Sequence, residues 1–254
     1  MKNTLYILFS FFVVSLFFSC KKEKDVVIDI GYNYFPDQVG RFVVYDVDST
    51  YYDDSNIDVI THTAPKYVYK FQIKEKIESI FNDNLNRPTI RLERYVKYYN
   101  SAIPYNQMTW TLRNVWTENK TKTTAEKVEE NIRFVKLAFP VNSSQNWNGN
   151  AQNTNAALNY SYSSIDVPLT LGLLAFDSTL QVNQQDETTL IDKKLSIEKY
   201  ARKAGLIYKQ IIDVGSQPTG LTGQSLTDFL NLPVMQRVTI GNQYTMTVSY
   251  YGTE

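Results

Sequence analysis

Short stretches in which apolar and polar residues alternate recur along most of this chain. The segments 67–74, 89–99 and 109–117 each repeat with a period of two. A period of two is typical of a β-strand that buries one face. In the second segment Ile90 and Leu92, together with Arg94 in the same alternation, oppose Arg91, Glu93 and Tyr95.

Other segments rich in valine, isoleucine, threonine and tyrosine predict further strands. They lie at 42–45, 120–130 paired with 132–137, 158–165, 167–182, 187–195 and 206–214. The charges of 120–130 also suit a helix, but its threonines suit an exposed strand, which we favour. The polar stretch 49–60 predicts a loop or an edge strand. Near the end, the strands 235–240 and 244–250 flank Gly241-Asn242, a pair suited to a two-residue hairpin turn.

Helical signals are few. Ser196 is a suitable N-cap, Glu198 lies in the first turn, Arg202 lies in the last turn, and Gly205 fits the left-handed stop position. These signals predict one short helix, and a second brief helix is predicted over 225–230. About ten strands with one or two short helices predict a mainly β fold. We expect a single antiparallel β-barrel or half-barrel, with a β-sandwich as the alternative.

The N-terminus has the pattern of an export signal. An apolar run at 5–18 ends at Ser19-Cys20 and is followed by the charged stretch 21–25. The run is short for a membrane span, and a small residue before a lone cysteine is typical of bacterial lipoprotein processing. Cys20 is therefore the predicted lipid attachment site, and the lipid is the predicted membrane partner. The predicted organisation is a signal peptide at 1–19, a tether at 20–30 and a β-rich domain at 31–254.

Charge and composition narrow the range of possible partners and cofactors. The 26 basic residues equal the 26 acidic ones, which argues against a nucleic-acid partner. With one cysteine and one histidine, His62, the chain lacks the usual ligands of a zinc site. No glycine-rich phosphate loop occurs. We therefore predict neither a metal nor a cofactor.

A glycosidase needs only two carboxylates at a suitable separation. The acidic loop residues offer such pairs, namely Asp53, Asp54 and Asp58, or Asp186 and Glu187. Acidic residues also collect in solvated loops without any catalytic role, and no nucleophile elbow accompanies His62. We therefore predict that the protein is not an enzyme. A glycosidase is the least favoured functional hypothesis.

Aromatic residues give the better indication of function. Trp116 and Trp147 are candidate ligand-binding residues, and Trp147 lies in a polar loop at 142–155, where a glycan platform would suit. The first hypothesis is a binding or assembly module whose half-barrel holds a lipid or acyl ligand in an apolar cavity. The alternative is a surface protein that binds a glycan.

Three short motifs resemble a set of Bacteroidetes lipoproteins of unknown function. They are the opening Tyr34-Phe35-Pro36-x-x-x-Gly40-x-x-x-x-Tyr45, the pair Phe139-Pro140 with Trp147-Asn148-Gly149, and the stretch 200–209. The resemblance implies a shared fold and a cell-envelope location, and no catalytic residues come with it. Lys21, rather than an aspartate, follows Cys20, which favours sorting to the outer membrane.

Overall fold

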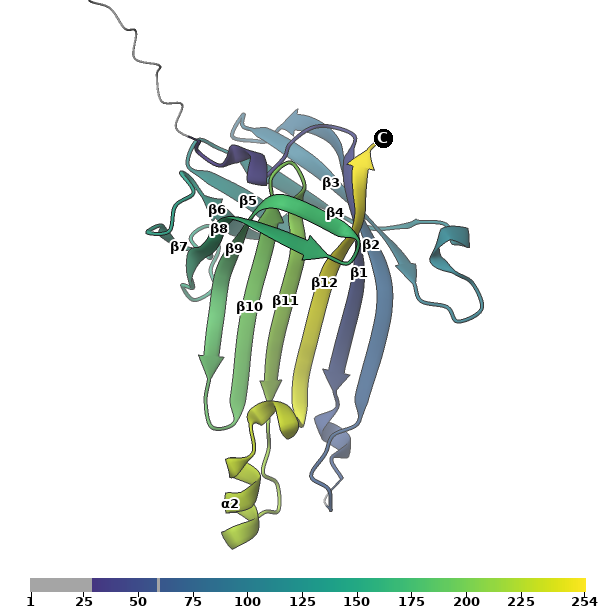
Figure 1. Ribbon diagram of the computed structural model, residues 1–254, viewed down its shortest axis with the longest axis vertical. Helices are drawn as coiled ribbons and strands as arrows, with labels where there is room; N and C mark the ends of the chain where they lie inside the picture. Colours follow the sequence, from purple (N-terminus) through teal and green to yellow (C-terminus); the bar gives the residue numbers. More distant parts are fainter. Residues whose placement is uncertain (1–28, 59) are drawn as a thin grey trace, which may run out of the picture.

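The computed structural model describes residues 29–58 and 60–254, and all of its named strands form one antiparallel sheet (Figure 1). This confirms the predicted mainly β fold. Cys20 and the predicted signal peptide lie outside the described residues. The strands are β1 (Arg41–Tyr52), β2 (Lys66–Asn82), β3 (Pro88–Tyr98), β4 (Thr111–Lys120), β5 (Thr124–Glu129), β6 (Ile132–Ala138), β7 (Asn146–Asn148), β8 (Asn159–Leu171), β9 (Leu174–Thr188), β10 (Asp192–Ala201), β11 (Gly205–Gly215) and β12 (Ile240–Thr253).

The strands follow one another as a meander whose first and last members pair. The order across the sheet is β6-β5-β4-β3-β2-β1-β12-β11-β10-β9-β8-β7. Strand β1 pairs with β2 on one side and with β12 on the other, along its full length. This central pairing joins an N-terminal half and a C-terminal half of the sheet. It leaves β6 and β7 as the two outer strands.

The two outer strands come together, so the sheet curls into a nearly closed barrel. The backbone nitrogen of Val135 on β6 donates to the carbonyl of Gly149 at 2.9 Å. The indole nitrogen of Trp147 on β7 donates back to the carbonyl of Val135 at 2.9 Å. On β8, the Tyr162 hydroxyl bonds the backbone of Ala138. The barrel prediction is thus confirmed, and the sandwich alternative does not describe this sheet.

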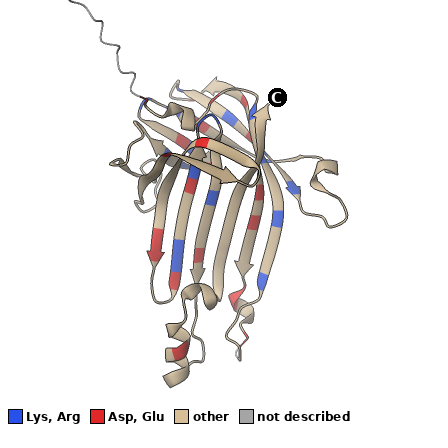
Figure 2. Ribbon diagram, viewed as in Figure 1, with Lys and Arg blue, Asp and Glu red and all other residues tan. Residues whose placement is uncertain are grey.

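Strands β2, β1, β12, β11, β10 and β9 continue beyond the closed part as an open, curved sheet (Figure 1). At its far end lies the α-helix α2 (Gly223–Asn231), which matches the helix predicted over 225–230. Four short 3-10 helices complete the described elements: η2 (Tyr32–Tyr34), η3 (Asp54–Asn56), η4 (Tyr105–Gln107) and η5 (Val234–Gln236). Acidic and basic residues are interspersed along the strands (Figure 2).

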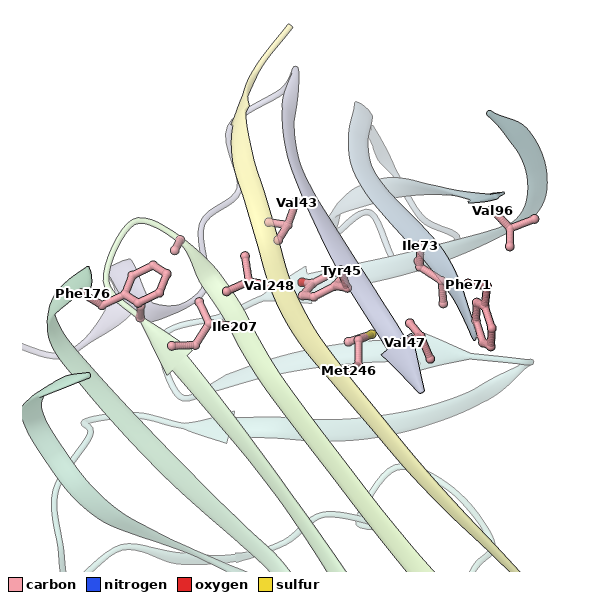
Figure 3. Close-up of a cluster of buried hydrophobic side chains, with 12 residues drawn as sticks. Val43, Tyr45, Val47, Phe71, Ile73, Val96, Phe176, Ile207, Met246 and Val248 are labelled. Atoms are coloured by element: carbon pink, nitrogen blue, oxygen red, sulfur yellow. The ribbon is translucent and has the colours of Figure 1, made fainter. Parts of the chain in front are cut away.

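Two apolar clusters hold most of the core. The first, drawn in Figure 3, gathers side chains from the central strands with Phe176 of β9 and Ile207 of β11. The second lies where the outer strands meet and contains Tyr34, Phe139 and Tyr200, with Trp147 packed against it. The three motifs noted in the sequence therefore converge in the second cluster, which gives them a shared packing role.

The predicted helix at 196–204 is wrong. These residues form the end of β10 and the turn into β11, and β10 pairs with β9 and β11. Glu198 is fully buried, whereas a helix would have left its first-turn acid in solvent. Sheet pairing on both sides outweighs the weak capping signals here. Gly205 does adopt a positive φ of 79°, but in a hairpin turn.

The predicted hairpin at 235–250 is also wrong. Residues Val234–Gln236 form η5, and β12 runs without interruption from Ile240 to Thr253. Gly241 has a φ of 103° inside the strand and pairs with Val214 of β11. Glycine within a strand often marks a close backbone approach rather than a turn. Here it allows the backbone of β11 to pass close by.

Candidate functional site inside the barrel

Eight charged side chains extend from the strands into the barrel interior. Because successive side chains of a strand point to opposite faces, alternate positions of each strand share the interior. The acidic members are Glu75 on β2, Glu118 on β4, Glu129 on β5 and Glu198 on β10; the basic members are Arg94 on β3, Lys127 on β5, Lys136 on β6 and Lys209 on β11. We call these eight residues the charge network, and its four acids balance its four bases.

One half of the charge network is centred on Glu75. Its carboxylate accepts hydrogen bonds from Arg94 Nε at 2.9 Å and from Lys127 Nζ at 2.8 Å. Lys127 also pairs with Glu118 at 3.2 Å. All four side chains are buried. Two acids and two bases thus neutralise one another between strands β2, β3, β4 and β5.

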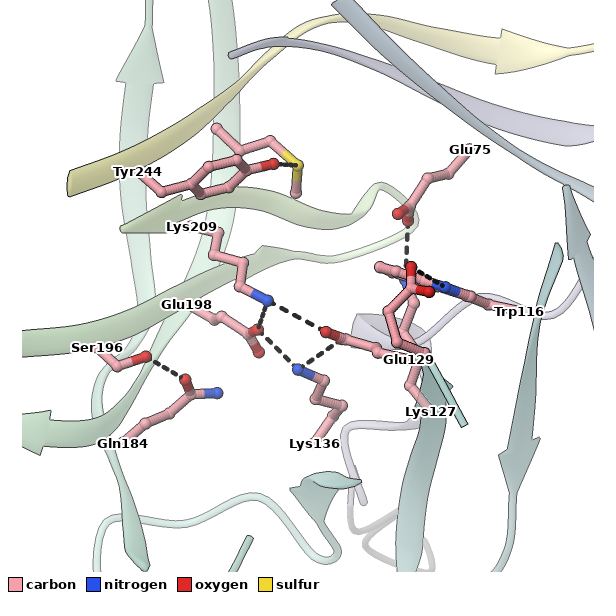
Figure 4. A network of polar contacts seen from close by, with 12 residues as sticks. Glu75, Trp116, Lys127, Glu129, Lys136, Gln184, Ser196, Glu198, Lys209 and Tyr244 are labelled. Carbon is pink, nitrogen blue, oxygen red and sulfur yellow. Dashed lines mark hydrogen bonds and ion pairs between the residues drawn. The ribbon is translucent and has the colours of Figure 1, made fainter. Parts of the chain in front are cut away.

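The other half is a closed ring of alternating charges (Figure 4). Lys136 Nζ lies 2.8 Å from Glu129 and 2.9 Å from Glu198. Lys209 Nζ lies 3.4 Å from Glu129 and 3.3 Å from Glu198. Tyr200 adds a hydroxyl donor to Glu198 at 2.7 Å. The ring joins β5 and β6 to β10 and β11, which are far apart in the strand order, so it ties the two halves of the sheet across the interior.

Burial and ion pairing shift the pKa values of the acids in the charge network in opposite directions. Burial alone would raise the pKa of Glu198, but Lys136 and Lys209 lower it to about 2. The pKa of Glu129 and that of Glu75 also fall below the ordinary value, because neighbouring cations outweigh the burial. Glu118 differs, since burial raises its pKa and Lys127 does not fully offset this.

A cleft of about 290 Å³ adjoins the charge network. Trp116, Tyr244 and Ile211 line it together with Arg94 and Lys209. The Arg94 guanidinium lies 3.5 Å from the centre of the Trp116 ring, which is close cation–π stacking. We call this space the inner cleft, and its lining combines aromatic faces with ion-paired polar groups.

A larger cleft of about 540 Å³ lies on the open part of the sheet and shares Arg94 and Tyr244 with the inner cleft. We call it the outer cleft. Tyr69, Tyr98 and Tyr99 line it and are 55%, 63% and 61% exposed. Soluble proteins seldom leave several large aromatic side chains exposed in one hollow unless that hollow binds something. The outer cleft is therefore the best candidate for a binding surface.

The structure separates the two tryptophans that the sequence singled out. Trp116 lines the inner cleft, whereas Trp147 packs on Tyr160 and Tyr162 and donates to the backbone of Val135. Trp147 thus has a clear structural role at the barrel closure. Both ligand-binding assignments stay predictions.

The predicted acidic pairs lie outside both clefts. Asp53 accepts a hydrogen bond from the nitrogen of Ser55 at the start of η3, and Asp58 accepts two from its own turn. Asp186 pairs with Lys193 on the surface. These are ordinary loop and edge contacts, in which each of the three carboxylates bonds to a neighbouring group.

Sequence reasoning missed nearly all of the charge network. Arg94 gave the single signal, because it falls on the apolar side of its strand and is indeed buried. Lys127 and Glu129 occupy alternate positions of a segment whose charges also suit a helix or an exposed strand. Nothing in the sequence indicates that they face Glu198 and Lys209 from the opposite half of the sheet.

Within residues 29–58 and 60–254, no three or more His, Cys, Asp or Glu side chains are grouped in a way that could hold a metal ion. In the same ranges, every helix is too short or too polar to cross a membrane.

No protein-family model matches the chain, and no curated protein sequence is similar to it. Among solved structures, the chain is similar to a protein of Bacteroides fragilis that has a YmcC-like fold and is proposed to be exported. The two share 9% sequence identity with a TM-score of 0.41, over 86% of this chain and 98% of the other. At this level the likeness carries no argument about function.

Proposed function

We propose that this chain is a lipid-anchored cell-envelope protein that binds a carbohydrate without catalysing a reaction. The observation that carries the proposal is the outer cleft, where exposed tyrosines surround an open hollow of about 540 Å³. The flat C–H face of a sugar ring packs on an aromatic face, and hydroxyls at the ring edge need polar partners. Arg94 and Arg113 supply such donors along the same lining.

The position of the cleft also suits an extended ligand. The outer cleft lies on the open part of the sheet and meets the inner cleft at Arg94 and Tyr244. A sugar chain could lie over the tyrosines with one end against Trp116. In this arrangement the charge network fixes Arg94 through Glu75, so the donor is held in place before the ligand arrives.

A lipid or acyl chain fits these clefts less well. The inner cleft is lined by Glu75, Arg94, Lys127, Glu129 and Lys209 as well as by apolar groups. An acyl chain there would remove water from ion pairs without replacing its hydrogen bonds, which costs free energy. A carbohydrate offers hydroxyls to the same groups, so we favour it over the apolar ligand.

Anchoring is the second part of the proposal. Cys20 would carry the lipid and the outer membrane would be its destination, as the signal pattern predicts. The described part of the chain begins at Asp29, which pairs with Arg202 at 2.5 Å. In Figure 1 the start of the described chain lies at the opposite end from α2. The open sheet and its clefts would therefore extend away from the membrane.

The test is a glycan array with the full-length protein, followed by titration calorimetry with any glycan that binds. Tyr69→Ala and Tyr98→Ala should each weaken binding about fivefold, because one stacking contact contributes on the order of 1 kcal/mol. The matched control is Tyr250→Ala, which removes a 45% exposed tyrosine outside both clefts. Binding that is unaffected by the cleft variants, or no binding to any glycan, would contradict the proposal.

A further inference from the structure

Arg41, the first residue of β1, carries a buried guanidinium without a counter-charge. Its Nε and Nη2 atoms are both buried and have no hydrogen-bond partner among the described residues. No carboxylate of the described residues pairs with it, and its guanidinium carbon lies 5.8 Å from the centre of the Tyr251 ring. Most buried donors in folded proteins are paired, so two unpaired nitrogens on one cation call for an explanation.

The side chain borders a cavity at the closed end of the barrel. The cavity measures about 60 Å³ and is lined by Arg41, Phe35 and Tyr45, and by members of the charge network that include Lys127 and Glu118. A volume of this size accommodates a few water molecules or one small oxyanion. Arg41 as a whole is half-buried, but its Nε and Nη2 atoms are covered, so a bound anion has to displace the groups that cover them.

Charge balance distinguishes Arg41 from the other cations at this cavity. Lys127 and Lys136 each contact two carboxylates. With Arg94 and Lys209 included, the charge network is neutral. The cavity lining also holds four carboxylates, those of Glu75, Glu118, Glu129 and Glu198, and all four pair with cations of the charge network. Among the cations of the lining, Arg41 therefore differs in having no carboxylate partner in the described part of the chain. Burial lowers the pKa of its guanidinium, but arginine stays protonated in proteins.

We propose that Arg41 forms a binding site for a small anionic group, a carboxylate or a phosphate, in the cavity at the closed end of the barrel. The planar fork of a guanidinium matches two oxygens of either group, and the two unpaired nitrogens are the donors for it. One bound negative charge balances the charge of Arg41. The lining excludes a bulky ligand, so the group is a small molecule or the charged end of a larger one. This site is separate from the tyrosine-lined outer cleft and does not depend on carbohydrate binding.

The test uses inorganic phosphate and acetate as probes on the full-length protein, with ionic strength held constant by chloride. In nitrogen-detected NMR, the Arg41 Nε–H resonance, assigned by its loss in Arg41→Lys, should shift saturably with at least one anion. The melting temperature should rise over the same concentration range. Arg41→Gln should abolish this rise, and Arg41→Lys should weaken binding about tenfold, because it keeps the charge and loses the fork.

Lys194→Gln is the matched control, since Lys194 is exposed, makes no ion pair among the described residues and lines neither the cavity nor the two clefts. It should bind the anion as the wild type does. The proposal is overturned if neither anion shifts the Arg41 resonance more than chloride does. It is also overturned if the lysine variant binds as tightly as the wild type, a comparison that holds even where the glutamine variant does not fold.

Discussion

Lys136 and Glu198 are separated by 62 residues in sequence, yet the Nζ atom of Lys136 lies 2.9 Å from Oε1 of Glu198 in the barrel interior. One residue belongs to β6 at an outer edge of the sheet and the other to β10 in the opposite half. The two strands never pair, so their contact exists only because the sheet curls. This ion pair and its ring partners therefore link the charge network to the closure of the barrel.

Removing one member of the ring should destabilise the fold strongly. Glu198→Ala leaves Lys136 and Lys209 with only Glu129 between them, in a buried setting. Loss of one partner from a buried ion pair costs about 3–5 kcal/mol, because the remaining charge is uncompensated. Urea unfolding followed by far-UV circular dichroism measures the change in the free energy of unfolding.

The control for this variant is Asp186→Ala. Asp186 pairs with Lys193 on the surface, where its side chain is 69% exposed. Exposed ion pairs contribute about 0–1 kcal/mol, so this substitution should change the free energy of unfolding very little. Equal losses in the two variants would show that the interior ring does not hold the sheet halves together.

The charge network should also give the protein an acid-sensitive stability. The pKa of Glu198 is about 2 in the folded protein and 4.5 as the ordinary value. A carboxyl with a lowered folded pKa contributes stability above its unfolded pKa and loses that contribution as the pH falls. The free energy of unfolding should therefore decline between about pH 4.5 and pH 2. Glu198→Gln should flatten this decline, and an unchanged slope would contradict the assignment.

Glu118 should affect the stability in the opposite direction from Glu198 and in a different pH range. Burial raises its folded pKa above the ordinary value of 4.5. A raised carboxyl pKa makes the folded state bind a proton more readily than the unfolded chain, so stability rises as the pH is lowered toward 4.5. Glu118→Gln should remove this rise while leaving the decline below pH 4.5 in place. Unfolding curves at half-unit pH steps separate the two contributions.

The sequence predicts the architecture well because alternation is a local property. The strands around Ile73, Leu92 and Trp110 were readable from their period of two, and their number implied one curled sheet. Local signals also caused the two errors. Capping residues around Ser196 and the turn-like pair at Gly241 are read from neighbours in sequence, whereas the partner strands that decide both cases lie elsewhere in the chain.

The binding site was harder to predict for the same reason. A lysine such as Lys136 on a strand is expected to face solvent unless its partner is known. Its partners lie on β5 and β10, and no pattern in the sequence connects them. The tyrosines of the outer cleft were visible only as an abundance of tyrosine. Their gathering depends on the pairing of β2 with β3, which aligns Tyr98 with Phe71.

Gly241 offers a sharp test of the corrected strand β12. A Cβ atom there would overlap the backbone of Asp213 and lie 2.8 Å from the Cα of Val214, and the φ of 103° is unfavourable for other residues. Gly241→Ala should lower the free energy of unfolding by about 2–4 kcal/mol, the sum of overpacking and backbone strain. A hairpin turn at Gly241 would tolerate the change far better.

Gly220→Ala is the matched control for this backbone effect. Gly220 also has a positive φ, of 76°, but an added Cβ meets nothing within 4 Å. This variant should lose only the strain contribution, about 1 kcal/mol. The difference between the two alanine variants isolates the clash with β11. If the two lose the same stability, the close approach of β11 to Gly241 is not present in solution.

Substitutions of Trp147 and Trp116 should affect stability and carbohydrate binding differently. Trp147→Phe removes the indole donor to the Val135 carbonyl and part of the contact with Tyr162, whose ring lies 4.6 Å away. It should cost about 1–3 kcal/mol of stability, because a half-buried carbonyl loses its partner where the barrel closes. Trp116→Phe leaves the closure intact and weakens the stacking of Arg94, so it should cost under about 1 kcal/mol of stability.

Carbohydrate affinity should respond in the reverse order, with Trp116→Phe weakening binding and Trp147→Phe leaving it near the wild-type value. Urea unfolding by circular dichroism and calorimetry on the same samples provide both readouts. Weaker binding in Trp147→Phe at conditions where it is fully folded would instead assign the glycan platform to the polar loop at 142–155.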